Sequence, residues 1–439
     1  MFQVEKRILD NGLRVIAAPM QGTKTAAVLA LAATGSKYEN RANNGLSHFL
    51  EHIFFKGSAR RPSALAVSSA LDGLGAEYNA FTGKECTGYW VKAEVRRLPE
   101  AMDILSDMLG RPCLPAVEIN RERGVILEEM NMYRDNPIMF IEDLWEGLLY
   151  GDTPAGWDTI GTKENILRLA KPDFQAYLDS QYGPANMIVS IAGAVSPSLV
   201  LKLANRYFNT RFFSVRGRSF HGKEAVVERQ SAPGLCLHEK KTDQAHLALG
   251  VRAYPYDHPD KLAVRLLSII LGGSMSSRLF SSLRERRGLA YYIRAKDEVY
   301  TDSGYLAAWA GVPVPKLPLA IDIILKEFKR IARQPVADKE LRLAKDLYRG
   351  RAALQLESAD DLAGWYGRQA ITRLALARGR GKNPPLALKT PARFFHLLDK
   401  ITAADLRRVA RDIFRTERLN LAVISPETDA RKISSALAL

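Results

Sequence analysis

The sequence predicts an α+β protein of two homologous domains, each an antiparallel sheet covered by helices. Three observations indicate this fold. The chain has 439 residues, and a single hydrophobic core rarely grows beyond roughly 250–300 residues. Segments of the first half recur at a near-constant spacing in the second half. Strand-like stretches with hairpin signals are interspersed with amphipathic helical stretches, a mixture typical of helices packed on an antiparallel sheet.

The repeat is visible in two pairs of segments. Residues 25–36, TAAVLALAATGS, align with residues 243–254, DQAHLALGVRAY, which lie 218 positions further on. Residues 171–193 align without a gap with residues 403–425, which lie 232 positions further on. Both members of the second pair predict an amphipathic helix, a short turn and an apolar strand. The two spacings are close enough for a few loop insertions to account for the difference.

The repeat sets the predicted domain boundaries. We predict an N-terminal domain over residues 1–212 and a homologous C-terminal domain over residues 235–439. Residues 213–234 between them are mostly polar and contain three glycines, which is typical of an exposed connector.

Within each half, local patterns predict strands followed by helices. The Asn11-Gly12 pair lies inside the alternating stretch RILDNGLRVIAAP and predicts a hairpin turn, and the stretch TGYWVKAEV from Thr87 predicts another strand. Helical periodicity covers LPEAMDILSDML from Leu98 and DKLAVRLLSIIL from Asp260. Sheets and helices therefore occur in mixed order in both halves.

Composition excludes several classes of protein. With 25% charged and 47% hydrophobic residues, the chain is neither disordered nor fibrous. Its three cysteines, Cys86, Cys113 and Cys236, have no CxxC spacing, which argues against a disulfide framework or a thiolate metal site and favours a reducing compartment. No apolar run approaches the roughly 18–20 residues of a membrane span. The charged start of the chain does not resemble a signal peptide, so we predict a cytoplasmic protein, with a removed transit peptide as the alternative.

The formal net charge of +15 is spread along the chain. The longest basic runs are RRP from Arg60, RERR from Arg284 and RGRGK from Arg378. Runs this short favour a solvated surface over a binding site for nucleic acid. We therefore expect no nucleic-acid partner; nucleic-acid binding, with a steep salt dependence, is the alternative that the charge alone would suggest.

One predicted helix of the first half carries a metal-binding pattern. Residues 45–56 read GLSHFLEHIFFK, with Asn43 and Asn44 as candidate N-caps and Gly57 beyond the C-terminal end. His48 and His52 are four positions apart, with Glu51 between them, so all three project from one helical face. Two imidazoles one turn apart can bind one zinc ion, and the intervening carboxylate can act on a water molecule. The alternative is an amphipathic core helix with ordinary histidine hydrogen bonds.

A third ligand is expected on the helix NRERGVILEEMNMYRDNP. Glu129 shares its face with Val125, Ile126, Met132 and Tyr133, so we expect a largely apolar, buried face. Glu128 instead has polar neighbours. A buried carboxylate needs a cation or a metal as partner, so we predict Glu129 as the ligand and Glu128 as a surface residue. Glu122, two turns earlier on the same face, could orient a ligating histidine. The alternative is a helix stabilised by Glu/Arg pairs.

These residues resemble the pitrilysin/insulinase family of inverzincin zinc metallopeptidases, and in particular its short bacterial members. The resemblance rests on the H-x-x-E-H order of HFLEH and on a second glutamate, Glu129, 77 residues after His52. It extends over nearly the whole chain, through GSKYE at Gly35, NAFTGKECTGYW at Asn79 and LGGSMSSRLFSSLRERRGLAYYI in the second half.

The resemblance implies a fold and a mechanism. The two domains would form a bilobed clam-shell around a chamber, with one zinc ion per chain bound by His48, His52 and Glu129 in the N-terminal domain. Glu51 would be the general base of a metalloendopeptidase that hydrolyses peptides or short unfolded segments.

Four further residues receive substrate-binding roles from the resemblance. Arg284 and Tyr291 of the C-terminal domain would bind substrate, and Asn79 and Ala80 would lie on an edge strand to which a peptide adds. The alternatives are that Arg284 lies on a solvated helix, that Tyr291 lies in a strand, and that Asn79 and Ala80 lie on an ordinary hairpin edge. In the second half, Leu266, Ile269 and Ile270 stand at the positions of the metal motif.

Assembly and activity leave alternatives open. The chain could be a noncatalytic scaffold or a processing-peptidase-like subunit of a hetero-oligomer. We favour an active enzyme that is a homodimer, because one chain carries both the zinc residues and the Arg/Tyr pair; a heterodimer with a related subunit is the alternative. The stretch GDTPAGWDTIGTKEN from Gly151 lacks a histidine that relatives often have there.

Overall fold

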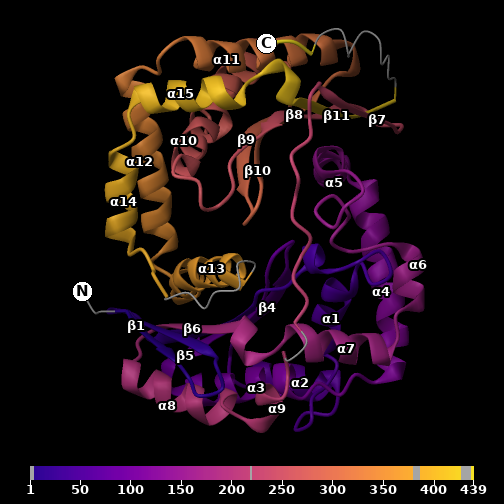
Figure 1. Ribbon diagram of the computed structural model, residues 1–439, viewed down its shortest axis with the longest axis vertical. Coiled ribbons are helices and arrows are strands. Elements are labelled where there is room, and N and C mark those ends of the chain that lie inside the picture. Colours follow the sequence, from indigo (N-terminus) through magenta and orange to yellow (C-terminus); the bar gives the residue numbers. More distant parts are fainter. Residues whose placement is uncertain (1–3, 218–219, 379–385, 427–436) are drawn as a thin grey trace. The chain divides into compact units, whose positions relative to one another are not determined.

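The computed structural model describes residues 4–217, 220–378, 386–426 and 437–439. They form two compact units, each containing one sheet (Figure 1). The first unit comprises Met1–Met130, Asp158–Glu224 and Ala352–Lys389, and the second comprises Asn131–Trp157, Ala225–Arg351 and Thr390–Leu439. Each unit is described separately below.

The sheet of the first unit has six strands in the order β1-β2-β6-β3-β5-β4. The strands are β1 (Glu5–Ile8), β2 (Arg14–Pro19), β3 (Thr25–Ala32), β4 (Glu77–Thr82), β5 (Thr87–Glu94) and β6 (Met187–Gly193). The predicted hairpin joins β1 to β2, with Gly12 in the left-handed region at φ +89°. All pairs are antiparallel except the parallel pair of β2 with β6. This parallel pair was not predicted, because its strands lie far apart in the sequence.

Helices cover both faces of this sheet. Successive residues of β3 point to opposite faces, so Val28 and Ala30 enter one core while Leu29 and Leu31 enter another. The first core is closed mainly by α1, α3, α7 and α8, and the second by α13. The helices are α1 (Leu46–Phe54), α2 (Ala64–Asp72), α3 (Leu98–Gly110), α4 (Ala116–Asp135), α6 (Lys163–Arg168), α7 (Lys171–Gln181), α8 (Pro197–Phe208), α9 (Arg211–Ser214) and α13 (Ala359–Arg378).

The sheet of the second unit has five strands in the order β7-β11-β8-β10-β9. The strands are β7 (Gly234–Glu239), β8 (Ala245–Arg252), β9 (Tyr292–Val299), β10 (Gly304–Val312) and β11 (Leu419–Ser425). The single parallel pair is β7 with β11. This order repeats that of β2-β6-β3-β5-β4, including the place of the parallel pair.

The helices of the second unit also lie on two faces of its sheet. Helix α5 packs on β11, β8 and β7, while α10, α11 and α15 close the core on the other side. The helices are α5 (Pro137–Tyr150), α10 (Lys261–Gly272), α11 (Leu317–Arg333), α12 (Asp338–Gln355), α14 (Pro391–Asp399) and α15 (Ala403–Ile413). Within the described ranges, none of the helices is both long and apolar enough to cross a membrane.

The repeat in the sequence is a repeat in the structure. Helix α7 and strand β6 begin at residues 171 and 187, and α15 and β11 begin 232 positions later, at residues 403 and 419. Each helix is followed by a short 3-10 turn, Pro184–Asn186 and Thr416–Arg418. The two homologous α+β domains predicted from the sequence are therefore confirmed as a fold.

One helix from each half of the sequence packs in the unit that is built mainly from the other half. Helix α13 belongs to the second half but packs on β3 and β6 of the first unit, and α5 belongs to the first half but packs in the second unit. Both sheets have a second apolar face, which these helices bury. The domain boundaries 1–212, 213–234 and 235–439 stay a prediction from the sequence repeat. Residues 220–233, within the predicted connector, contain no helix or strand.

Candidate metal centre

Helix α1 forms as predicted, but its start differs from the prediction. Gly45, not Asn43 or Asn44, is the N-cap, in the left-handed conformation at φ +97° and with no side-chain cap. Asn44 is buried and its amide donates to Glu39 Oε2 (3.1 Å) and to the carbonyl of Asp158 (3.1 Å), so it is not free to cap the helix. At the other end the helix stops at Phe54, three residues before Gly57.

The structure brings the three predicted metal ligands together. Nε2 of His48 lies 3.7 Å and Nε2 of His52 lies 3.5 Å from Oε2 of Glu129. One ligand atom from each residue can be chosen so that all lie within 4.8 Å of one another. Ligands of a tetrahedral zinc ion at the usual bond lengths lie about 3.4 Å apart. The donor set of two imidazoles and one carboxylate therefore fits a zinc ion.

Glu129 and Glu128 lie on different faces of helix α4, as expected. The side chain of Glu129 is 23% exposed, whereas Glu128 is exposed. The expectation that the whole Glu129 face is buried was wrong, since Val125 and Met132 are 50% and 52% exposed. Val125 and Met132 lie on one side of Glu129, which faces away from the core. Ile126 lies on the other side, which is buried.

Glu122 contacts His52, one of the predicted metal ligands, as its position suggested. Its Oε2 lies 3.0 Å from Nδ1 of His52, which leaves Nε2 of that ring for a metal. Its Oε1 lies 2.6 Å from Nζ of Lys56. Lys56 was missed in the sequence, although its position four residues after His52 places it on the same side of the helix. A chain of polar contacts thus runs from Lys56 through Glu122 to His52.

Burial and charge set the ionisation of the site before a metal binds. Burial, together with the charge of the neighbouring His52, lowers the pKa of His48 to about 4 against the opposing effect of Glu129. Burial also acts to lower the pKa of His52, but the hydrogen bonds and charges of Glu129 and Glu122 outweigh it and raise that pKa. The neutral form of His48, which is the form that binds a metal, is therefore favoured.

Glu51 is held by a residue that the sequence did not reveal. The hydroxyl of Thr82, at the end of β4, donates to Oε2 of Glu51 at 2.5 Å. Burial raises the pKa of Glu51, and this hydrogen bond opposes the rise. Because Oε2 is engaged, Oε1 is the oxygen available for proton transfer.

The predicted edge strand is β4, the last strand in the order of the first sheet. Asn79 and Ala80 pair with Trp90 and Tyr89 of β5 on its inner side. The side-chain carbonyl of Asn79 accepts a hydrogen bond from the backbone N–H of Ala80 (2.8 Å). No other strand of the described residues pairs with the outer side of β4.

Arg284 and Tyr291 belong to the second unit and contact each other. Arg284 lies in the helical turn Phe280–Glu285 and donates from Nη1 to the backbone carbonyl of Tyr291 (2.8 Å). Its guanidinium also lies over the ring of Phe280, 5.2 Å from the centroid. The side chain of Tyr291 is 73% exposed. At the positions that match the metal motif, Leu266, Ile269 and Ile270 are buried in the core.

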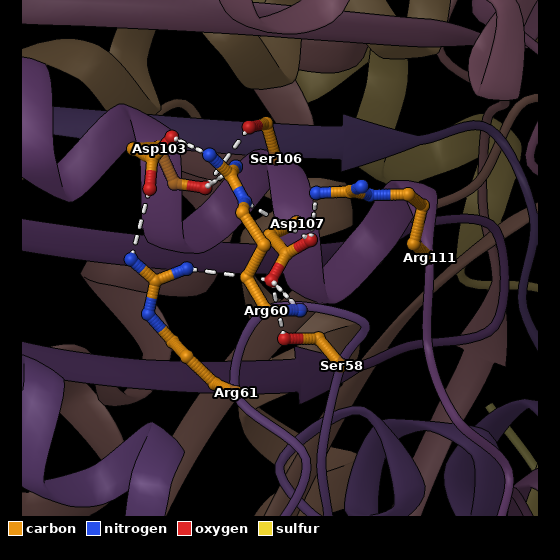
Figure 2. Close-up of polar contacts among 7 residues, drawn as sticks. All are labelled: Ser58, Arg60, Arg61, Asp103, Ser106, Asp107 and Arg111. Atoms are coloured by element: carbon orange, nitrogen blue, oxygen red, sulfur yellow. Dashed lines mark hydrogen bonds and ion pairs between the residues drawn. The ribbon is translucent and has the colours of Figure 1, made fainter.

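The basic run at Arg60 lies at the surface, as predicted, with the side chain of Arg60 45% exposed, but it is also part of an ion-pair cluster that was not predicted (Figure 2). Arg60 and Arg61 form ion pairs with Asp103 and Asp107 of α3. The fully buried carboxylate of Asp107 also accepts from the hydroxyl of Ser58 (2.6 Å). The segment that follows α1 is thereby fixed to α3.

Of the other two basic runs, the run from Arg284 is described in full and is exposed, whereas only the first residue of the run from Arg378 is described. Arg287 donates to the carbonyl of Ser282 (2.8 Å), and Arg378 donates to Oδ1 of Asn186 (2.9 Å). The rest of the run after Arg378 lies outside the described residues. All three cysteines are free thiols, as expected.

Comparison with known families decides the relationship of this chain. Residues 14–163 match the family described as Insulinase (Peptidase family M16), and residues 168–348 match the Peptidase M16 inactive domain. The chain belongs to the insulinase family, peptidase family M16. The resemblance inferred from the H-x-x-E-H motif is confirmed.

Relatives of the insulinase family match nearly the whole chain. An uncharacterized zinc protease of Bacillus subtilis is 31% identical over 96% of this chain and 98% of its own length. An uncharacterized zinc protease of Mycobacterium leprae is 30% identical over 98% of this chain and 93% of its own length. A crystal structure of a protease from Helicobacter pylori has the same fold, with a TM-score of 0.86 and 22% identity over 97% of this chain and 99% of the other.

Proposed function

We propose that this chain is a zinc-dependent metalloendopeptidase with one zinc ion bound by His48, His52 and Glu129. The observation that carries the proposal is the convergence of these side chains at distances that suit one ion, with Glu51 beside them on the same helix. The names of the relatives, zinc proteases, agree with this chemistry.

The mechanism follows from the site. A zinc ion bound there would lower the pKa of a water molecule toward about 7 and polarise the scissile carbonyl group. Glu51 accepts the proton of the attacking water at Oε1, since Thr82 binds Oε2. Glu51 then delivers the proton to the leaving amine. Glu122 orients His52 through Nδ1.

The substrates we propose are peptides or short unfolded segments. An extended peptide would add to the outer side of β4 at Asn79 and Ala80, where backbone groups can pair with it. Arg284 and Tyr291 would bind carbonyl oxygens of the substrate, a contribution of the oxyanion-hole type. A chamber between two lobes, as the family resemblance implies, would restrict the size of the substrate.

The location and assembly of the enzyme are further parts of the proposal. We place it in the cytoplasm, where its three free thiols stay reduced. We expect a self-sufficient homodimer, because one chain carries both the zinc ligands and the Arg/Tyr pair. A mass measurement of the purified protein, with activity assayed in the absence of any other protein, tests this expectation. Activity that appears only after a second gene product is added would contradict it.

The alternative is a noncatalytic scaffold or a processing-peptidase-like subunit of a hetero-oligomer. It draws on the match of residues 168–348 to a domain described as inactive. That match covers none of the residues proposed to bind zinc, all of which lie before residue 130.

A digest of a mixed peptide library, read by mass spectrometry with and without a metal chelator, tests the proposed activity. We expect internal cleavage that the chelator abolishes and added zinc restores. If zinc-loaded protein leaves every peptide of the library intact, the chain is not a general peptidase and the scaffold becomes the better assignment.

A further inference from the structure

A buried carboxylate lies at the first turn of the metal-binding helix. Oε1 of Glu39 accepts a hydrogen bond from the backbone N–H of Ser47 (2.6 Å), and Oε2 accepts from the backbone N–H of Gly45 (2.8 Å) and from Nδ2 of Asn44 (3.1 Å). Gly45 is the residue before α1 and Ser47 is the second residue within it. Glu39 is only 4% exposed.

Helix α1 depends on an external partner at this end. The first N–H groups of any helix have no partner within the helix. The N-cap of α1 is a glycine, which has no side chain to accept from them. Isolated helices as short as this nine-residue helix are not stable in water. Glu39 supplies the missing acceptors from a position six residues before Gly45.

Burial raises the pKa of Glu39, and hydrogen bonds from Ser47, Gly45 and Asn44, not a cation, oppose this rise. Within residues 4–217, 220–378, 386–426 and 437–439, Glu39 forms no ion pair. A buried carboxylate without compensating donors is costly. Here the compensation comes from three N–H donors and from the positive end of the helix dipole. Carboxylate and helix end therefore stabilise each other.

The same turn carries a metal ligand. Ser47, which donates to Glu39, directly precedes His48. The hydroxyl of Ser47 is also hydrogen-bonded to the hydroxyl of Tyr177 (2.6 Å), which in turn contacts the hydroxyl of Thr34 (2.7 Å). His48 lies in the first turn of α1, whereas His52 lies one turn further along. Movement of the first turn would therefore displace His48 from Glu129.

We propose that Glu39 is a positioning residue for the metal centre: its carboxylate fixes the first turn of α1, and with it His48, in the geometry that binds zinc. This inference rests on the proposed function, because it assumes that His48 is a zinc ligand. It assigns no contact of Glu39 with substrate or with the reacting atoms.

Glu39→Gln tests the proposal directly. An amide has one acceptor oxygen, so its NH₂ group must face either the N–H of Gly45 or the N–H of Ser47, and one hydrogen bond is lost. We expect zinc to dissociate about tenfold or more readily, the range seen when groups that orient metal ligands are removed. Competition with a chromophoric chelator measures this affinity. The absorption spectrum of the cobalt-substituted protein should also change, because it reports ligand geometry.

Asn186→Ala is the matched control for a purely structural effect. Asn186 is fully buried in the same unit, and its amide donates to the carbonyls of Ala33 (3.2 Å) and Gln181 (2.8 Å). None of its hydrogen bonds reaches α1. We expect this variant to unfold at a lower temperature but to bind zinc with unchanged affinity when assayed well below that temperature.

The outcomes separate the two proposals. If the wild-type protein binds zinc and cleaves peptides, but Glu39→Gln binds zinc as tightly as Asn186→Ala does, Glu39 is only a stabilising cap and this inference fails. If the wild-type protein binds no zinc, both the proposed function and this inference fail. Should Glu39→Gln not fold, Glu39→Asp decides: it keeps both acceptor oxygens on a shorter side chain, so weakened zinc binding by folded protein supports the proposal and wild-type affinity contradicts it.

Discussion

The hydroxyl of Thr82 donates a hydrogen bond to Oε2 of Glu51 across 2.5 Å. Thr82 is the last residue of the edge strand β4, and Glu51 lies in α1 between His48 and His52. The contact fixes the orientation of the carboxylate and leaves one oxygen free. It also ties the proposed general base to the strand on which we expect the substrate to lie.

Thr82→Val should therefore slow catalysis without removing zinc. Valine keeps the shape of threonine but cannot donate, and a hydrogen bond to a charged group contributes about 1.5–3 kcal/mol. We expect kcat to fall about 10- to 100-fold, with little change in KM or zinc content. Thr82→Ser retains the donor and should restore most of the activity. Equal losses in both variants would show that packing, and not the hydrogen bond, is what matters.

Glu51→Gln and His52→Ala should separate catalysis from metal binding. Glutamine cannot accept the proton of the attacking water, so we expect zinc to be retained and nearly all peptide hydrolysis to be lost. His52→Ala removes a ligand and should lose both. Elemental analysis together with a peptide assay measures the two properties. Full activity in Glu51→Gln would remove Glu51 from the mechanism.

The two histidines of the proposed metal site could be predicted from the sequence because they lie close together on one helix. Two histidines one helical turn apart, with a glutamate between them, fix a geometry whatever the rest of the fold. Glu129 required a comparison of helix faces, and that comparison chose the glutamate that lies beside the two histidines, although Val125 and Met132 proved to be exposed.

The residues that support the ligands could not be predicted, because long-range folding brings them to the site. Thr82 contacts Glu51 from strand β4, and Glu39 contacts the start of α1 from an irregular segment. Neither side chain belongs to a periodic pattern. The repeat likewise predicted two related sheets, but it carried no information about the helices α5 and α13, which pack in the unit built mainly from the opposite half.

Lys56→Met should weaken zinc binding through Glu122. Lys56 lies 2.6 Å from Oε1 of Glu122, whose other oxygen is 3.0 Å from Nδ1 of His52. Without the ammonium group, the 8% exposed carboxylate of Glu122 loses its cation and holds the imidazole less firmly. We expect about a tenfold loss of zinc affinity, measured by chelator competition. Lys56→Arg should keep most of the affinity, and unchanged binding by Lys56→Met would show that Glu122 acts without Lys56.

Asp107→Asn should destabilise the protein at neutral pH. The buried carboxylate of Asp107 accepts from Ser58, Arg61 and Arg111 (Figure 2). Removing one partner of a buried ion pair costs about 3 kcal/mol, so we expect a loss of this size in the free energy of unfolding, measured with urea. Asp103→Asn is the control, because Asp103 is partly exposed and its pairs with Arg60 and Arg61 should contribute about 1 kcal/mol or less.

The stabilisation by Asp107 should also depend on pH in a defined direction. Burial acts to raise the pKa of Asp107, but the hydrogen bonds from Ser58 and from the backbone of Arg60, with the charges of Arg111 and Arg60, outweigh it and lower the pKa. The folded state therefore binds this proton less readily than the unfolded state, in which an aspartate has a pKa of about 3.9. The contribution is fully present above that pH and is lost as the pH falls through the lower pKa of the folded state. The difference in unfolding free energy between wild type and Asp107→Asn should thus shrink from neutral pH to below about pH 4, and a difference that stays constant over this range would contradict a lowered pKa.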